Sequence, residues 1–382
     1  MEEWKEYKLG DIYEVHNGLS KGGKFFGSGY PFLSFSTIFN NWFIPNELSN
    51  LVQSTDKEQE SYSIKEGDVF ITRTSETADE LGMSCVALKD YPKATYNGFC
   101  KRMRQYNHDI EVNPKYIGYY LRNPNFRLHF QAFSGSMSTR ASLTNEALLG
   151  LTVKIPPLPT QQKIAAILSS LDDKIELNNK ININLEQQAQ ALFKNWFVDF
   201  EPFGGKMPEG WKVGKLSNLI TVKYGKDHKK LDDGKYPVYG SGGIMRYVDK
   251  FLYDKESVLI PRKGTLNNVF YINEPFWSVD TVFYTEMKKE NIAKYVYFFV
   301  KNKDLNAMNA GSAVPSMTTE ILNAMEVIIP DDNQFEKFAT LASPMFKQMK
   351  QYIMENKKLI SLRDTLLPKL MNDEIEVDEV DL

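Results

Sequence analysis

The sequence predicts an α+β protein: two mixed α/β domains are separated by two long antiparallel coiled-coil helices, in a pseudo-twofold dumbbell. Two observations predict this fold. One is an internal repeat that covers the whole chain, and the other is a heptad pattern that follows each copy of the repeat. A chain of 382 residues, 42% hydrophobic and 25% charged, has the composition of a globular protein with room for two to three domains.

The repeat keeps its order along both halves. Trp4-Lys5 returns as Trp211-Lys212, and Tyr30-Pro31 returns as Tyr236-Pro237. The later matches, in chain order, are Asp68 to Arg73 with Ser257 to Arg262, Lys115 to Asn123 with Lys294 to Asn302, Leu143 to Glu146 with Met317 to Glu320, and Ile155-Pro156 with Ile329-Pro330. A period this long indicates domain duplication, and the second copy is shorter because of deletions inside it.

Strands and turn-rich loops dominate each repeated domain, here called head 1 and head 2. The apolar runs that end at Arg73 and Arg262 predict two equivalent strands, each followed by a polar turn. Other short runs rich in β-branched and aromatic residues alternate with turns. Each head is therefore expected to be a mixed α/β domain whose loops carry basic and small polar residues.

A long helix is predicted after each head. No proline or glycine occurs from Thr160 to about Trp196, whereas Glu201 to Gly205 contains helix-stopping residues. Residues at seven-residue spacing form a predicted coiled-coil seam: Ile164, Leu171, Asn178, Leu185 and Leu192 in the first helix, and Phe338, Met345, Tyr352, Leu359 and Leu366 in the second. Asn178 fits either a polar register device or a tolerated buried amide.

The predicted helices are too long for each seam to be buried by one head alone. A helix of about 37 residues is about 55 Å long, which exceeds what one small head can cover. The other helix of the same chain is the simplest partner, and it would run antiparallel because head 2 lies between the two in sequence. Packing of each helix on its own head, or homodimerisation, remains an alternative. The resulting domain limits are 1–155, 156–203, 204–330 and 331–382.

Charge distribution and the lack of sorting signals are typical of a cytoplasmic globular protein. The net charge is −3, with the heads neutral to positive and the negative charge collected in the helices and in the tail from Asp373 to Glu379, which is expected to be solvated and frayed. No signal peptide or membrane span is evident, so a cytoplasmic location is expected. Cys85 and Cys100 are the only cysteines and are expected to be ordinary packed thiols.

Clusters of basic and small polar residues in the loops are the candidate binding sites. Glycines let a backbone approach phosphate, lysines neutralise it, and arginine or hydroxyl side chains can contact base edges. A charge cluster is more often a solvated surface, but Arg73 and Arg262 stand out because they are duplicated. The candidates are Lys21, Lys24, Arg73, Thr74, Arg102, Arg104, Ser136, Ser138 and Arg140 in head 1, and Lys226, His228, Lys229, Lys230, Ser241, Arg262, Lys263, Thr265 and Ser312 in head 2.

Motifs for catalysis are not found. Asn113-Pro114-Lys115-Tyr116 resembles the Asn-Pro-Pro-Tyr signature of adenine methyltransferases, but its second proline is a lysine, and a helix start is the better interpretation. There is no GxGxxG after a strand, no phosphate-binding Walker loop and no histidine spacing for zinc. The sequence therefore predicts a chain without catalytic residues, metal site or cofactor of its own.

The junction of head 1 with its helix carries a family resemblance. Ile155-Pro156-Pro157-Leu158-Pro159-Thr160-Gln161-Gln162-Lys163-Ile164, continuing to Asn178, closely resembles the specificity subunit of type I restriction-modification enzymes. Leu192 to Phe200, before a Gly-Trp-Lys restart, resembles that family's central conserved region. Thr160 stands where an acidic residue is common, and the second junction, Pro330 to Gln334, keeps only part of the pattern.

The resemblance implies a function. It implies two target-recognition domains that each read one half of a bipartite DNA sequence through the major groove, with the helices as a ruler between them. It also implies two modification subunits that methylate adenine with S-adenosylmethionine, and restriction subunits that use ATP and Mg²⁺, so the cofactors would belong to the partners. A coiled-coil DNA-binding adaptor outside restriction systems, or a stand-alone methyltransferase or nuclease, are the alternatives.

Overall fold

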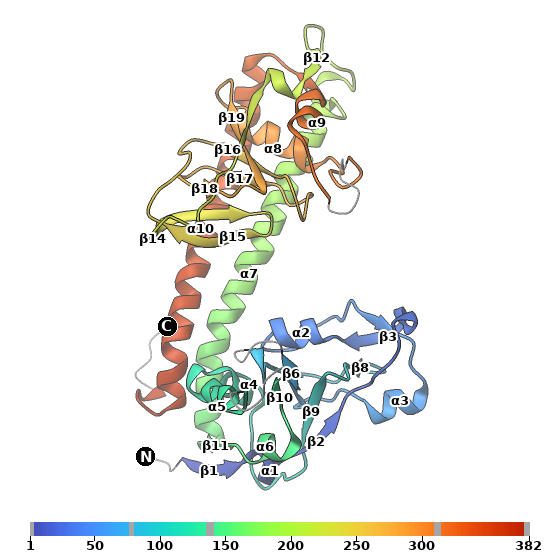
Figure 1. Cartoon of the computed structure of the whole chain (residues 1–382), viewed down its shortest axis with the longest axis vertical. Coiled ribbons are helices and arrows are strands. Elements are labelled where there is room, and N and C mark those ends of the chain that lie inside the picture. Colours follow the sequence, from blue (N-terminus) through green and yellow to red (C-terminus); the bar gives the residue numbers. More distant parts are fainter. Residues whose placement is uncertain (1–3, 76–79, 135–140, 309–314, 378–382) are drawn as a thin grey trace. The chain divides into compact units, whose positions relative to one another are not determined.

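The protein folds into two compact units, which are described separately. The structure is a computed structural model that describes residues 4–75, 80–134, 141–308 and 315–377 (Figure 1). Unit 1 comprises residues 1–177 and 355–382, and unit 2 comprises residues 178–354. Helices α7 (Leu158–Phe197) and α10 (Asp332–Met371) each contribute one half to each unit.

Head 1 is built from short strands and helices. In chain order these are β1 (Lys5–Lys8), α1 (Leu9–Ile12), β2 (Tyr13–Asn17), η1 (Gly23–Phe25), β3 (Phe26–Leu33), α2 (Phe35–Asn40), β4 (Leu51–Val52), α3 (Asp56–Ser61), β5 (Val69–Thr72), β6 (Thr74–Ser75), β7 (Ser84–Val86), β8 (Thr95–Tyr96), β9 (Cys100–Gln105), α4 (Pro114–Arg122), α5 (Pro124–Ser134), β10 (Ala141–Ser142), α6 (Asn145–Leu149) and β11 (Thr152–Ile155). The predicted strand that ends at Arg73 is thus β5.

Head 2 contains a shorter series of the same kind. Its elements are η3 (Glu201–Phe203), β12 (Lys212–Lys215), η4 (Leu216–Asn218), β13 (Ile220–Tyr224), β14 (Asp233–Gly240), β15 (Gly243–Val248), β16 (Ser257–Pro261), β17 (Phe270–Ile272), β18 (Trp277–Ser278), β19 (Val282–Met287), α8 (Ala293–Lys301), α9 (Thr319–Ala324) and β20 (Glu326–Ile329). The predicted strand that ends at Arg262 is β16.

The sheets repeat between the heads, as the sequence repeat predicts. The four-stranded order β2-β9-β5-β7 returns as β13-β19-β16-β17, and the three-stranded order β4-β3-β8 returns as β15-β14-β18. The pair β1-β11 returns as β12-β20. Even the exceptions correspond, because β3 with β8 and β14 with β18 are the parallel pairs in otherwise antiparallel sheets. The duplication therefore extends to strand order and direction.

One connection differs between the heads. In head 1 the chain needs residues 34–50, including α2, to pass from β3 to β4, whereas in head 2 only Ser241 and Gly242 separate β14 from β15. The short connection makes a tight hairpin because Gly243 adopts a φ of 118°, which favours glycine. This difference explains part of the length lost from the second copy.

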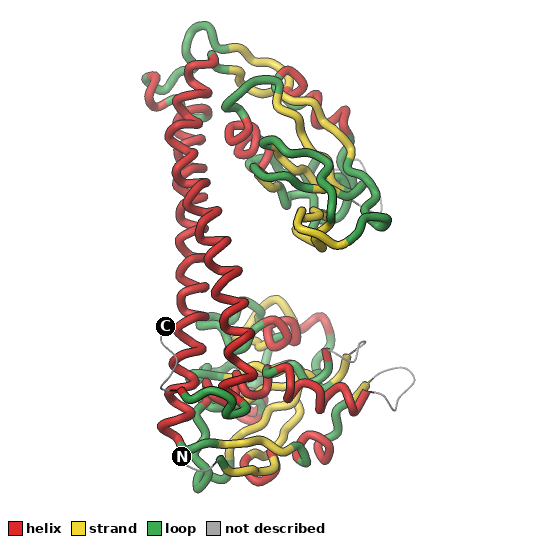
Figure 2. The backbone as a smooth tube through the Cα atoms, turned by 90° about the vertical axis from the view of Figure 1, so that its left-hand side faces the viewer, coloured by secondary structure: helices red, strands yellow, loops and turns green. Residues whose placement is uncertain are grey.

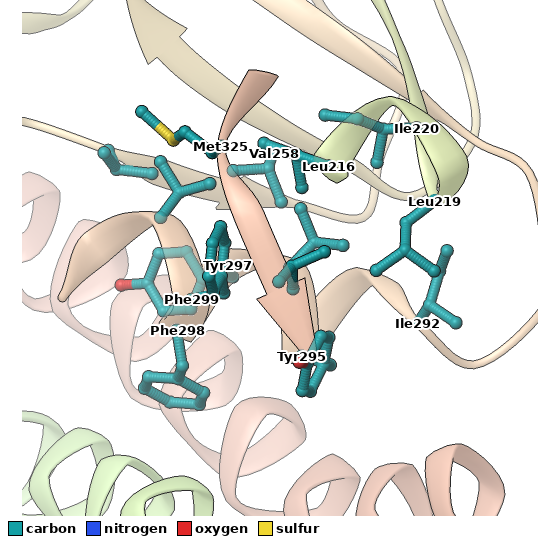
Figure 3. Close-up of a cluster of buried hydrophobic side chains, with 14 of the residues drawn as sticks. Leu216, Leu219, Ile220, Val258, Ile292, Tyr295, Tyr297, Phe298, Phe299 and Met325 are labelled. Atoms are coloured by element: carbon teal, nitrogen blue, oxygen red, sulfur yellow. The ribbon is translucent and has the colours of Figure 1, made fainter. Parts of the chain in front are cut away.

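Each head buries its apolar side chains against the two helices. In unit 1, Ile164 and Leu168 of α7 and Leu367 and Leu370 of α10 join the core of head 1. In unit 2, Phe193 and Phe338 from the same two helices join the core of head 2. Figure 3 shows the part of this second core where side chains of η4, β13, β16 and α8 meet, including Leu216, Ile220, Val258 and Tyr295.

The residues of the predicted seam are buried or half-buried along both helices. Ile164, Leu171, Asn178 and Phe338 are buried, and the other six seam residues are half-buried. The first helix begins at Leu158 and ends at Phe197, within two residues of the predicted limits. Its stop follows from Phe200, Gly204 and Gly205, which all have positive φ and cannot continue an α-helix.

Within unit 1 the two helices run in opposite directions (Figure 2). An ion pair between Arg363 and Asp172 links them. Asp172 accepts a hydrogen bond from Arg363 Nη1 at 2.6 Å and another from the Tyr119 hydroxyl at 2.6 Å. The Arg363 guanidinium also lies 4.8 Å from the ring centroid of Trp42. One arginine thus ties α10 to α7 and to head 1, with its charge neutralised by a carboxylate and its face covered by an aromatic ring.

The C-terminal tail differs from its prediction. Ile375 and Val377 are half-buried and pack against the core of unit 1, whereas Glu374 and Glu376 are exposed. The alternation places the apolar side chains on the protein and the carboxylates in solvent. The expectation of a solvated, frayed tail is therefore wrong for residues 375–377.

The two cysteines are free and buried, in β7 and β9. Burial raises the pKa of the Cys85 thiol to about 12 and also raises the pKa of Cys100. Because only the thiolate reacts, we expect iodoacetamide at pH 8 to label both thiols at least about 100-fold more slowly in the folded protein than in urea. Rapid labelling of the folded chain, read by mass spectrometry, would contradict this packing.

Candidate nucleic-acid interface

Both heads bring their candidate segments together through the same backbone hydrogen bonds. The segment after β2 begins with Gly18, whose N–H donates to Cys100 O at 3.2 Å. Its counterpart after β13 begins with Gly225, whose N–H donates to Val282 O at 3.1 Å. Each of these segments leads directly into predicted contact residues, Lys21 and Lys24 in head 1 and Lys226 to Lys230 in head 2.

Neither glycine leaves room for a side chain. A Cβ added to Gly18 would lie 2.2 Å from Asn97 O, and one added to Gly225 would lie 2.1 Å from Val279 O. Both obstacles are backbone atoms, which cannot swing aside. The two loops are therefore fixed against the segments between β8 and β9 and between β18 and β19.

We expect Gly18→Ala to destabilise unit 1 by about 2–4 kcal/mol, because the backbone must shift to relieve the overlap. Gly22→Ala is the matched control in the same loop, since a Cβ at Gly22 has no atom within 4 Å. Hydrogen exchange of the β2 and β9 amides would report the change in stability. Equal exchange rates in both variants would show that the close approach of Gly18 to Asn97 does not contribute to stability.

The duplicated arginines occupy equivalent backbone positions. The N–H of Arg73 donates to Phe99 O at 3.0 Å, and that of Arg262 donates to Thr281 O at 2.8 Å. Their carbonyl oxygens accept from Leu143 N at 2.9 Å and Met317 N at 2.8 Å, respectively. The sequence alignment of Arg73 with Arg262 thus corresponds to a shared three-dimensional position.

The two arginine side chains differ in surroundings. Arg262 is half-buried, with Nη1 donating to Asp280 O at 3.3 Å and its guanidinium 5.4 Å from the ring centroid of Tyr224. Arg73 is also half-buried, and its Nε has no hydrogen-bond partner within the described part of the chain. Among the described residues, neither guanidinium is ion-paired with a carboxylate, so the positive charge of each is available to a ligand.

Head 2 has a cavity of about 700 Å³ where its candidate segments meet. Of the predicted residues, His228, Lys229 and Ser241 line it. The full lining is Asp227, His228, Lys229, Gly240, Ser241, Gly242, Gly243, Ile244, Met245, Val279, Asp280 and Thr281. Three segments that are far apart in sequence therefore form one surface.

Further contacts bring the Arg262 segment to the rim of this cavity. Lys263 N donates to Thr281 O at 3.2 Å, and Asn268 Nδ2 donates to Ser241 O at 2.8 Å. The side chains of Lys226, Lys230, Lys263 and Thr265 are exposed. Lys263 therefore lies next to the cavity wall, whereas Lys226 and Lys230 flank the lining segment Asp227–Lys229 in the chain.

In head 1 three predicted contacts have internal partners. The Lys21 ammonium pairs with Glu58 at 2.7 Å and donates to Gln53 O at 2.6 Å, and its hydrogen bond holds the pKa of Glu58 below its usual value. Arg102 is 4% exposed and donates to Ser63 O at 2.7 Å. Arg104 binds Asp68 with two hydrogen bonds, of 2.7 and 2.6 Å. These contacts indicate structural roles, which sequence clustering alone did not reveal.

The remaining head 1 candidates are more accessible. Lys24 is exposed, with its ammonium 5.2 Å from the ring centroid of Phe25, and Thr74 is half-buried in β6. Thr74 pairs with Ser142, so the segment after Arg73 meets the strand that precedes Leu143. The predicted contacts Ser136, Ser138, Arg140 and Ser312 lie outside the described residues.

Comparison with known proteins identifies the family. Residues 1–187 and 208–356 match the type I restriction modification DNA specificity domain. The chain belongs to this family. Two curated relatives are each 24% identical: the type I restriction enzyme MjaIX specificity subunit of Methanocaldococcus jannaschii, over 99% of this chain and 95% of the relative, and the HindI specificity subunit of Haemophilus influenzae, over 98% and 100%.

A solved structure supports the fold. The S subunit of a type I restriction-modification system from M. genitalium has a TM-score of 0.57 and 15% identity, over 97% of this chain and 96% of that one. The specificity subunit described here is a mixed α/β protein and a non-catalytic, DNA-binding component of such a system. Within the described ranges, no helix is both long and apolar enough to cross a membrane.

The motif that resembled a methyltransferase signature is a helix cap, as predicted. The Asn113 side chain accepts from Tyr116 N at 3.0 Å at the start of α4, and Tyr116 is buried with its hydroxyl donating to Lys154 O at 2.9 Å. Neither residue could hold a flipped base. Among the described residues, no group of three or more histidine, cysteine or acidic side chains is placed to hold a metal ion.

Sequence reasoning missed several cavity residues of this specificity subunit. Ile244, Met245, Asp227 and Asp280 line the cavity but were not among the predicted contacts. The sequence did carry a signal for the first two, because Gly242-Gly243 predicts a tight turn and the apolar pair follows it directly. No sequence pattern marked Asp280, because it lies beside Arg262 only in the folded chain.

Proposed function

We propose that each head of this specificity subunit reads one half of a bipartite DNA target, and that the helices set the distance between the halves. Head 1 would comprise residues 1–155 and head 2 residues 204–330, with spacers at 156–203 and 331–382. The observation that carries this proposal is the repeated framework, in which Arg73 and Arg262 occupy equivalent positions beside equivalent loops. Two similar domains in one chain could each bind one of two separate half-sites.

The chemistry of the loops supports DNA as the ligand. Glycine-rich turns, exposed lysines and an arginine whose charge is not neutralised by a carboxylate provide phosphate neutralisation and base-edge contacts. The cavity of head 2 combines these groups with the carboxylates of Asp227 and Asp280. Since a carboxylate repels phosphate but accepts from the amino group of cytosine, a surface of this kind favours base contacts at its centre and phosphate contacts at its rim.

The helices are proposed to dock two modification subunits. Several of their large apolar side chains are exposed, which is unusual for a helix that meets only solvent. They are Leu177, Ile360 and Leu362 in unit 1, and Ile183, Leu341, Ile353 and Met354 in unit 2. In this proposal the modification subunits bring S-adenosylmethionine, the restriction subunits bring ATP and Mg²⁺, and this chain brings the sequence specificity.

The first test is a genome-wide map of adenine methylation in the native host, compared with a strain that lacks only this chain. We expect one split motif with a fixed spacer to lose methylation, and its sequence would be the target. If the map does not change while the modification subunits are expressed, the proposal fails. Expression of the chain from a plasmid should restore the same motif.

A salt titration separates this function from that of a coiled-coil adaptor. The complex of the full chain with its modification subunits should bind a target duplex at least about 1,000-fold more tightly than a random duplex at physiological salt. An adaptor would bind both equally, and its affinity would only fall with rising salt. The ratio of the two dissociation constants is therefore the decisive measurement.

A further inference from the structure

The tip of the β14–β15 hairpin exposes two adjacent apolar side chains. Ile244 is 43% exposed and Met245 is 60% exposed. In a regular strand, neighbouring side chains point to opposite faces, so one of the two would be expected to pack on the head. Here both remain exposed, and both line the cavity that contains His228, Lys229 and Ser241.

A β-bulge explains this placement. Val238 pairs with Arg246 and Tyr239 pairs with Ile244, which leaves Met245 without a partner on β14. A bulge of this kind bends the strand and redirects a side chain, and bulges are common next to functional sites. Ile244 and Met245 are thereby both presented to the cavity instead of to opposite faces of the sheet.

The glycines of the hairpin fit the same arrangement. Gly243 has a φ of 118°, in the region that side chains other than glycine rarely adopt. Gly240 lies under Met245, since a Cβ added there would be 2.6 Å from Met245 Sδ. The turn thus holds the apolar pair at the end of a narrow two-stranded ribbon.

The chemistry around the pair indicates what it contacts. Lys229 is exposed and His228 half-buried in the same cavity, which Asp227 and Asp280 also line. The exposed Lys226 and Lys230 flank this lining segment in the chain, and Lys263 N donates to Thr281 O of the wall. Exposed lysines close to an apolar pair suit DNA, whose backbone is anionic and whose bases carry apolar groups. The major groove admits a two-stranded ribbon, and its one apolar base feature is the 5-methyl group of thymine.

We propose that Ile244 and Met245 recognise the 5-methyl group of a thymine in the half-site that head 2 reads. This inference rests on the proposed function and adds a specificity element to it. It applies to head 2 alone, because in head 1 residues 34–50 and helix α2 replace the hairpin. Only one half-site should therefore depend on this contact.

Thymine-to-deoxyuridine exchange tests the contact, since it removes one methyl group and leaves every hydrogen bond of the base pair. Duplexes carrying the mapped target, with each thymine of both half-sites replaced in turn, are titrated with the complex of the full chain and its modification subunits. Burial of one methyl group corresponds to roughly a threefold to tenfold change in affinity. We expect that loss at one or two thymines, all within one half-site.

A variant comparison ties the methyl group to the hairpin. In I244A/M245A the thymine and deoxyuridine duplexes should bind equally, within about twofold. Met207→Ala is the matched control, because Met207 is 41% exposed in the same unit but does not line the cavity. This control should keep the sensitivity of the unaltered chain, and circular dichroism should show that all variants fold.

The outcomes are distinct. The inference is overturned if no thymine is sensitive, if the double variant keeps the sensitivity, or if the sensitive thymines lie in the half-site that depends on Arg73. It is also overturned if the double variant weakens binding while 2-aminopurine fluorescence reports an unstacked step, because the pair would then act as a wedge. Failure of the unaltered complex to prefer its target over random DNA would instead refute the proposed function.

Discussion

Replacing Arg262 with alanine should weaken binding to the target duplex about 5-fold to 150-fold, and the loss should come from one half-site. Arg262 follows β16, beside the cavity of head 2, and its guanidinium donates a hydrogen bond to the backbone oxygen of Asp280. A charged group in this position can turn to a base edge or a phosphate without breaking an ion pair. Loss of one such arginine contact costs about 1–3 kcal/mol.

The half-site is identified by scrambling. When the half-site read by head 2 is scrambled, Arg262→Ala and the unaltered chain should bind alike, because the contact is already lost. When the other half-site is scrambled, the full difference should remain. Arg73→Ala should show the reverse pattern, since Arg73 occupies the equivalent position in head 1.

Lys255→Ala provides the control for charge alone. Lys255 is an exposed lysine of head 2 that does not line the cavity. Its loss should lower affinity for target and random duplexes equally and slightly. If Arg262→Ala behaves like Lys255→Ala, then Arg262 acts only through the overall charge and does not read the sequence.

Much of the fold could be predicted from the sequence because two of its signals are long. The heptad pattern extends over the whole of α7, so single exceptions such as Asn178 do not obscure it. The repeat anchors the strands at Arg73 and Arg262 by comparison of one half with the other. The strand orders were not predicted, because they depend on pairings between residues that are distant in sequence.

The candidate site was predicted less well, for a physical reason. Lys21, Arg102 and Arg104 lie in basic clusters, yet each has an internal partner that is remote in sequence: Glu58, Ser63 and Asp68, respectively. A basic residue in a cluster contacts a ligand only if folding leaves it without such a partner. Conversely, Gly242-Gly243 predicts the turn before Ile244 and Met245, but the bulge that brings both side chains to the cavity depends on pairing with β14.

Replacing Asp68 with alanine should have the largest effect on stability. Asp68 is 1% exposed, and its carboxylate accepts two hydrogen bonds from Arg104 and one from Lys65 N at 2.7 Å. The same contact raises the pKa of Arg104, so the arginine stays charged in every practical buffer. Removal of the carboxylate leaves that charge uncompensated, and we expect unit 1 to lose about 3–5 kcal/mol.

Asp90→Ala is the matched control for the loss of a backbone cap. Asp90 is exposed and accepts from Glu66 N at 2.9 Å, so its replacement should cost about 1 kcal/mol. Hydrogen exchange of the β5 and β9 amides measures the loss of stability of unit 1 in both variants. Similar values for Asp68→Ala and Asp90→Ala would show that the pairing of Arg104 contributes little.

The second copy of the repeat shows that the fold does not need this charge pair. In head 2 the position of Asp68 is taken by Ser257, which is buried and exchanges hydrogen bonds with Thr285 at 2.8 and 3.0 Å. D68A/R104M should therefore recover more than half of the stability that Asp68→Ala loses, because no buried charge remains unpaired. If the recovered double variant also binds its target normally, Arg104 is structural. If it is stable but has lost one half-site, then Arg104 contacts DNA after all, and its hydrogen bonds to Asp68 must open when DNA binds.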